Sequence, residues 1–177
     1  MMMKRFGISF LLAASLLLAG CSDLGTGTVR MMQGKWRPVY ASGSYEDAAY
    51  VHTYDGPVNE LGEITGLSTG KDHPEVQYDH RISFSGLKFY RKGGEDLFLQ
   101  FSLDPGKNSG SAEPLHYRIA GDSLYFEMPN GYFVNGDSAD DHLKFLQEGS
   151  GKYRSAPFTI LDDNTVHIGT VTYSRMK

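Results

Sequence analysis

The chain has 177 residues, a formal net charge of −4 and one cysteine, so it is long enough for one ordinary domain and excludes an internal disulfide. The acidic balance argues against nucleic acid as a partner, because binding phosphates requires a basic face. A metal site built on several cysteines is excluded as well, so the core alone must hold the domain together.

The first twenty residues have the three parts of a secretory signal. Lys4 and Arg5 give a positive start, the run Phe6–Ala19 is apolar and uncharged, and small residues precede Cys21. The apolar run is shorter than the roughly 20 helical residues that span a bilayer. We therefore predict a cleaved export signal over residues 1–20. Its loss takes two of the 17 basic residues and leaves 15 against 21 acidic ones, a net charge of −6.

The signal ends Leu18-Ala19-Gly20-Cys21, which resembles the lipobox of bacterial lipoproteins. The resemblance implies diacylglyceryl transfer to the Cys21 thiol, cleavage after Gly20, and acylation of the new amine by a fatty acid such as palmitate. Two or three acyl chains anchor a protein stably. Ser22 occupies the place where an aspartate would retain the protein in the inner membrane, so the outer membrane is favoured, at its periplasmic face or the cell surface. The alternative is an uncleaved signal anchor with an incidental cysteine.

The rest of the chain is expected to form a polar tether over residues 21–30 and one domain over residues 31–177. From Gly34 onward apolar residues recur at every second position, which predicts antiparallel strands with one buried face. The clearest runs are 76–85, 97–103, 115–119 and 124–128. Short Gly, Asp and Asn links between the runs favour hairpins between sequential neighbours. Eight or so such strands predict a mostly-β meander that closes into a barrel or splits into a sandwich.

Three segments depart from this pattern. The phase of the apolar residues slips at Gly169, which predicts a β-bulge in the final strand. Ser138 and Asp141 resemble a capping box, which predicts a short helix running to Leu146. The stretch 55–75 is rich in Gly, Thr, Asp and Pro and is expected to be a long mobile loop or a poorly formed hairpin.

Gly34-Lys35-Trp36 opens the first strand, and Gly-x-Trp in this place resembles the lipocalins and the lipocalin-like domains of bacterial lipoproteins. The resemblance spans residues 31–177 and implies a lipocalin-like barrel. In the family an arginine on the last strand packs over this tryptophan, which implies a structural pair of Trp36 and Arg175. Pro38 lies inside the first strand and requires an edge or a bulge, so a partly open barrel is the more conservative expectation.

The residues favour binding over catalysis. Ser42, Ser44 and Ser83 and six histidines are present, but no Gly-x-Ser-x-Gly elbow accompanies them. Three carboxylates and one imidazole lie close together in the sequence, at Asp137, Asp140, Asp141 and His142. Such a group could bind calcium or zinc. These residues lack metal-site spacing, and acids suit the first turn of a helix. We therefore expect no enzyme activity, no cofactor and no metal.

His80 lies on the apolar phase of its strand, either as a histidine satisfied within the core or as a polar contact in a ligand pocket. If the barrel carries a ligand, the predicted lining residues are Tyr78, His80, Ile82, Leu99, Phe101, Tyr117, Phe126 and Ile168. An eight-stranded barrel is either just filled by side chains or holds one small ligand. The sequence thus predicts a lipid-anchored envelope protein that binds a small apolar ligand. The alternative is a structural or protein-interaction module of the outer membrane with a filled barrel.

Overall fold

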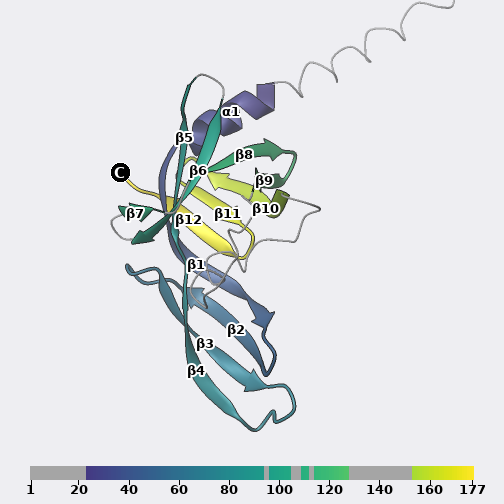
Figure 1. The fold of residues 1–177 in the computed structure, drawn as a ribbon. Helices are drawn as coiled ribbons and strands as arrows, with labels where there is room; N and C mark the ends of the chain where they lie inside the picture. The colour runs from purple at the N-terminus through teal and green to yellow at the C-terminus, as the bar shows by residue number, and fades with distance from the viewer. Residues whose placement is uncertain (1–22, 94–95, 105–108, 112–113, 128–152) are drawn as a thin grey trace, which may run out of the picture. The chain divides into compact units, whose positions relative to one another are not determined.

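The computed structural model describes residues 23–93, 96–104, 109–111, 114–127 and 153–177 (Figure 1). The chain divides after Met32 into two compact units. In the first unit, α1 (Asp23–Met32) occupies most of the segment predicted to be a tether. Arg30 lies in the last turn of α1, where a cation interacts favourably with the helix dipole. No helix in the described part of the chain is long and apolar enough to span a bilayer.

The second unit is built around an antiparallel β-barrel of eight strands. Its strands are β1 (Gly34–Glu46), β5 (Gly86–Arg91), β6 (Leu97–Asp104), β8 (Leu115–Ala120), β9 (Ser123–Glu127), β10 (Tyr153–Asp162), β11 (Thr165–Ile168) and β12 (Val171–Arg175). From β5 to β12, consecutive barrel strands pair with each other, and β1 pairs with β5. The short strand β7 (Ser109–Ser111) pairs only with β6 among the described residues.

The barrel closes where β12 pairs with β1, from Trp36 opposite Arg175 to Ala41 opposite Val171. The register slips between Pro38 and Tyr40, so Pro38 lies at an irregularity, as a proline within a sheet requires. The mostly-β, lipocalin-like meander predicted from the sequence is confirmed. Closure is complete in the described strands and goes further than the partly open barrel that Pro38 suggested.

The second half of β1 leaves the barrel and begins a four-stranded sheet, which we call the extension (Figure 1). Its other strands are β2 (Tyr50–Pro57), β3 (Glu63–Gly70) and β4 (Gln77–Ser83). The loop or poor hairpin expected over residues 55–75 is therefore wrong, because this stretch contains the end of β2 and all of β3. The buried positions of β3 include Gly66, Ser68 and Gly70, which carry no apolar signal in the sequence.

Buried apolar side chains form the core of the barrel. Every barrel strand contributes at least one side chain that is 5% exposed or less: Trp36, Leu87, Phe89, Leu99, Phe101, Leu115, Tyr117, Leu124, Phe126, Phe158, Val166, Ile168, Val171 and Tyr173. These residues alternate along their strands with exposed or half-buried ones, as in β8 and β11. The alternation that defines one buried face therefore continues around the barrel.

The turns follow the sequence with one correction. Gly121-Asp122 joins β8 to β9, and Asp163-Asn164 joins β10 to β11, as predicted. The predicted bulge at Gly169 is wrong: Ile168 pairs with Val171 across a tight turn, and Gly169 has a φ of 63°. A hairpin turn explains the slip in phase because it separates two strands that read as one. The helix predicted from Ser138 lies outside the described residues.

Candidate functional site

The eight predicted ligand-lining residues fall into two groups. Five are buried in the barrel, namely Leu99, Phe101, Tyr117, Phe126 and Ile168. The other three, Tyr78, His80 and Ile82, are on β4 in the extension. Ile82 is buried, His80 is half-buried and Tyr78 is 42% exposed. The alternation that placed these three on one face of their strand is correct, but their strand is not one of the eight that form the barrel.

Tyr117 is the main polar side chain among the buried predicted residues. Its hydroxyl accepts a hydrogen bond from Nε2 of Gln33 at 3.1 Å, and its ring packs edge-on against Phe89 with centroids 5.0 Å apart. Burial raises the pKa of Tyr117 to about 12, so the phenol is neutral at physiological pH. Its polar atom is thus used inside the fold.

Arg175 and Trp36 form the contact implied by the resemblance to the lipocalins. The guanidinium carbon lies 4.3 Å from the centroid of the Trp36 ring, and Trp36 is fully buried. Nη1 of Arg175 donates to the carbonyl of Gln33, and Nε donates to the carbonyl of Asp163 at 3.3 Å. These bonds fix the planar guanidinium over the indole, the geometry in which a cation–π contact is attractive.

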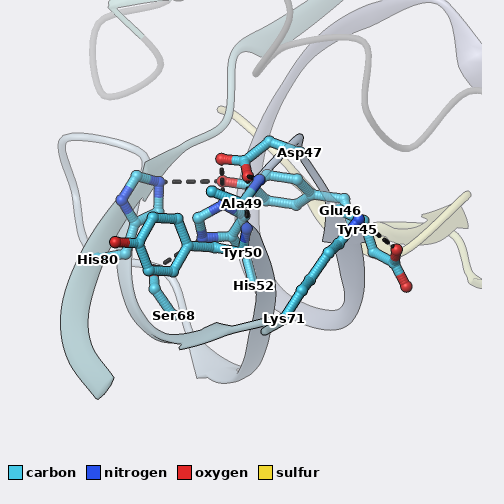
Figure 2. Close-up of polar contacts among 9 residues, drawn as sticks. All are labelled: Tyr45, Glu46, Asp47, Ala49, Tyr50, His52, Ser68, Lys71 and His80. Atoms are coloured by element: carbon cyan, nitrogen blue, oxygen red, sulfur yellow. Dashed lines mark hydrogen bonds and ion pairs between the residues drawn. The ribbon is translucent and has the colours of Figure 1, made fainter. Parts of the chain in front are cut away.

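The extension carries a group of rings that we call the aromatic–histidine cluster: Tyr45, Tyr50, His52, Tyr78 and His80. Figure 2 shows all of these except Tyr78. Tyr45 stacks on His52 with centroids 4.5 Å apart, and the His52 and His80 rings are 4.7 Å apart. Tyr50 packs edge-on against Tyr78 at 5.2 Å. The Tyr45 hydroxyl and His80 Nε2 are hydrogen-bonded at 3.0 Å. Three strands, β1, β2 and β4, therefore place five rings in one group.

His52 is held at the centre of the cluster by a polar partner on each ring nitrogen. Nε2 lies 2.9 Å from Oδ2 of Asp47, and Nδ1 lies 2.7 Å from Oγ of Ser68 (Figure 2). The hydrogen bond from His52, followed by those from two backbone amides, lowers the pKa of Asp47 well below its usual range. Asp47 is thus an anion at neutral pH, to which Nε2–H donates, and the Ser68 hydroxyl can then donate to Nδ1.

The arrangement contains the residue types of a hydrolytic triad but does not expose a nucleophile. Ser68 is fully buried and His52 is 3% exposed, so the serine oxygen is out of reach of a substrate. Nucleophilic catalysis needs a serine that can approach the reacting carbonyl. The chain of bonds from Asp47 through His52 to Ser68 instead ties the β1–β2 turn to β2 and β3 and orients the ring on which Tyr45 stacks.

Local sequence explains why the strands meet this closely. Oδ1 of Asp47 accepts from the backbone amides of Ala49 at 2.8 Å and Tyr50 at 2.7 Å, which forms the turn between β1 and β2. A Cβ added at Gly66 would lie 2.5 Å from the carbonyl oxygen of Thr53, so only glycine permits this approach of β3 to β2.

The opposite face of the extension is exposed to solvent. A groove of about 350 Å³ lies on it, lined by Thr53, Tyr54, Asp55, Thr65, Gly66, Leu67 and Asp79. Beside the groove, the exposed Tyr40 hydroxyl donates a hydrogen bond to Asp55 at 2.7 Å. This bond is the main reason why the pKa of Tyr40 is raised. At the far end of the sheet Lys71 and Glu46 form an ion pair at 2.7 Å (Figure 2).

Sequence reasoning missed Tyr45, Asp47, His52 and Ser68. The signal available for His52 was its alternation with Tyr54, which marks a strand with one buried face. The cluster that the sequence analysis considered and rejected as a metal site, Asp137, Asp140, Asp141 and His142, lies outside the described residues. Within the described part of the chain, no group of three or more His, Cys, Asp or Glu side chains could hold a metal ion.

The fold and the site define a closed antiparallel barrel from which a sheet bearing an aromatic–histidine cluster extends. Comparison of the chain with protein-family models, with curated proteins and with solved structures gives no match. Function must therefore be argued from the residues and their geometry.

Proposed function

We propose that this chain is a lipid-anchored protein of the bacterial cell envelope that acts by binding and not by catalysis. In this proposal the barrel is a filled scaffold, and the extension carries the binding surface. The observation that carries the proposal is the set of buried apolar side chains to which all eight barrel strands contribute. A carrier of a small apolar ligand would need an open interior, so the interaction module is the better-supported of the two functions.

The proposed anchor is Cys21, acylated after removal of residues 1–20. Its support is the order of a basic start, an apolar run and Leu18-Ala19-Gly20-Cys21. The chain has no other cysteine, so the thiol at position 21 is its one acceptor for a thioether-linked lipid. Ser22 favours the outer membrane, as argued above. The domain then works at a membrane surface, tethered through its N-terminus.

The aromatic–histidine cluster has the properties of a protein-binding surface. Tyr78 is 42% exposed and Tyr45 and Tyr50 are half-buried, so part of each ring meets solvent. Tyrosine is enriched at interfaces because its ring supplies apolar area while its hydroxyl stays hydrated or bonded. The cluster is also preorganised, since Asp47 and Ser68 fix His52 beneath Tyr45. A rigid surface loses less conformational entropy on binding.

The test is photo-crosslinking in cells that express the full chain, with a photoreactive phenylalanine analogue at one tyrosine position. Tyr78 probes the cluster, and Tyr125 on β9 is the matched control, because it is a half-buried strand tyrosine outside the extension. We expect a discrete adduct with an envelope protein other than a second copy of this chain from position 78, and none from position 125. Equal labelling from both positions, or none from position 78, would overturn the assignment of binding to the extension.

A further inference from the structure

Strand β4 forms one edge of the extension. The strand order ends at β4, and among the described strands only β3 pairs with it (Figure 1). One side of this seven-residue strand therefore presents backbone groups that no described strand pairs. A free edge of this kind is a template on which another strand can pair.

The side chains of β4 are arranged symmetrically about its central residue, His80. Asp79 precedes His80 and Arg81 follows it, and both are exposed on the outer face, opposite Leu67 and Thr65 of β3. Tyr78 and Ile82 flank His80 on the inner face, opposite Ser68 and Ile64. If a second β4 is laid antiparallel to the first and centred on the same residue, Asp79 therefore meets Arg81 on the outer face. On the inner face Tyr78 meets Ile82.

We propose that β4 is a self-recognition edge, which pairs antiparallel with β4 of a second copy of the chain across a two-fold axis at His80. In this register Asp79 of each copy lies opposite Arg81 of the other, which makes two equivalent charge pairs. On the inner face, Tyr78 lies opposite Ile82 of the second copy. The contact is isologous, the type found in closed two-fold dimers, and it joins the two extensions into one continuous sheet.

The charges select this register over its neighbours. Opposed residues of an antiparallel pair point to the same face of the sheet. The two-fold axis must therefore pass through a residue, and the nearest alternative registers place it at Asp79 or at Arg81. An axis at Asp79 would bring the two Asp79 carboxylates face to face, and an axis at Arg81 would oppose the two guanidiniums. Opposite charges placed across two strands stabilise the pair, whereas like charges destabilise it.

Both charged side chains are exposed and can reach this contact. Arg81 Nη1 lies 3.5 Å from Oε1 of Glu63 on β3, but the Arg81 side chain is 76% exposed, and exposed pairs of this kind are weak. A seven-residue edge makes a small interface, typical of weak association. Anchoring of two copies on one membrane would raise their effective concentration, but the pairing itself depends only on β4.

The test is oxidative crosslinking of the full chain in the cells that produce it, with His80→Cys as the probe. Opposed Cα atoms of an antiparallel pair are about 4.5–5.5 Å apart, within the range of a disulfide. Gln77→Cys is the matched control, because its two copies would be about 20 Å apart in this register. The parent chain, whose only cysteine is Cys21, gives the background. Circular dichroism of each purified variant verifies that it is folded.

Charge reversal in the His80→Cys background supplies the second arm. Asp79→Arg leaves two bases on each strand and Arg81→Asp leaves two acids, so each change alone should lower the crosslinked fraction about tenfold or more. Coexpression of these two variants with different tags should restore a mixed dimer. The double exchange Asp79→Arg with Arg81→Asp should restore the homodimer, because the strand is again self-complementary.

A crosslink at position 80 that exceeds the background, that is absent at position 77 and that follows the charge pattern supports the proposal. No crosslink at position 80 above the background would overturn it. Equal crosslinking at positions 77 and 80, or a crosslink indifferent to the charges, would also overturn it. The result is independent of the proposed function, because crosslinking can be read in the membrane or the soluble fraction and needs no other partner.

Discussion

Truncation of Trp36 to alanine should severely destabilise the barrel. The indole is fully buried on β1 and lies beneath the Arg175 guanidinium at 4.3 Å. An aromatic side chain buries about 150–250 Å², which at about 25 cal/mol per Å² corresponds to about 4–6 kcal/mol. Measured truncations of buried aromatic residues cost about 3–5 kcal/mol. Loss of the cation–π contact adds about 1 kcal/mol, because Arg175 is only partly desolvated.

The assay is urea unfolding followed by far-ultraviolet circular dichroism, because Trp36→Ala removes the chain's only tryptophan. With a slope of about 2 kcal/mol per molar urea, a loss of about 4 kcal/mol lowers the midpoint by about 2 M. Against a total stability of about 5–15 kcal/mol this is a large share. Tyr125→Ala is the matched control, because Arg118 lies 4.2 Å over the half-buried Tyr125 ring. It should cost about 1 kcal/mol or less. Equal midpoints for the two variants would refute the argument that Trp36 anchors the barrel.

Three further predictions concern single residues. Cys21→Ser should release the chain from membranes or leave residues 1–20 attached, which fractionation and intact mass would detect; a variant that fractionates and migrates like the parent would contradict lipidation. The hydrogen bond from His52 lowers the pKa of Asp47, so the carboxylate stabilises the β1–β2 hairpin above the unfolded pKa of about 3.9, and this contribution is lost as the pH falls towards the folded pKa. Hydrogen exchange at Tyr50, corrected for its intrinsic rate, should show weaker protection below about pH 4 in the parent but not in Asp47→Asn; parallel profiles would contradict this. The Tyr173 hydroxyl is buried with no hydrogen-bond partner in the described structure, so Tyr173→Phe should leave the unfolding free energy unchanged or raise it by about 1–2 kcal/mol, and a clear loss in urea would contradict this.

The alternation of apolar residues was sufficient to predict the antiparallel strands of the meander, although it left a barrel and a sandwich open. It located β6, β8 and β9, and the Gly121-Asp122 turn between the last two. These strands pair with near neighbours in the chain, so local pattern and topology agree. The contact between Trp36 and Arg175 followed from a family resemblance, since no local pattern links residues at opposite ends of a domain.

The extension could not be predicted in the same way, because its buried face uses small and polar residues. Gly66 and Ser68 of β3 give no apolar period, although each is buried. The small size of Gly66 permits the close approach of β3 to β2, with Ile82 and Tyr54 packed beside it, and Ser68 bonds to the ring of His52. The insertion of three strands between β1 and β5 also moved Tyr78 out of the barrel, which alternation within one strand cannot reveal.

The measurement that tests the central claim most directly is native mass spectrometry of the full chain expressed in a bacterial host and purified from its envelope in detergent. The proposal of a lipid-anchored module with a filled barrel predicts a polypeptide that begins at Cys21, carries two or three acyl chains and retains no further small molecule when the detergent is removed in the gas phase. An unprocessed chain without lipid would contradict the proposed anchor. A small apolar molecule bound in stoichiometric amount would contradict the filled barrel and restore the function of a carrier.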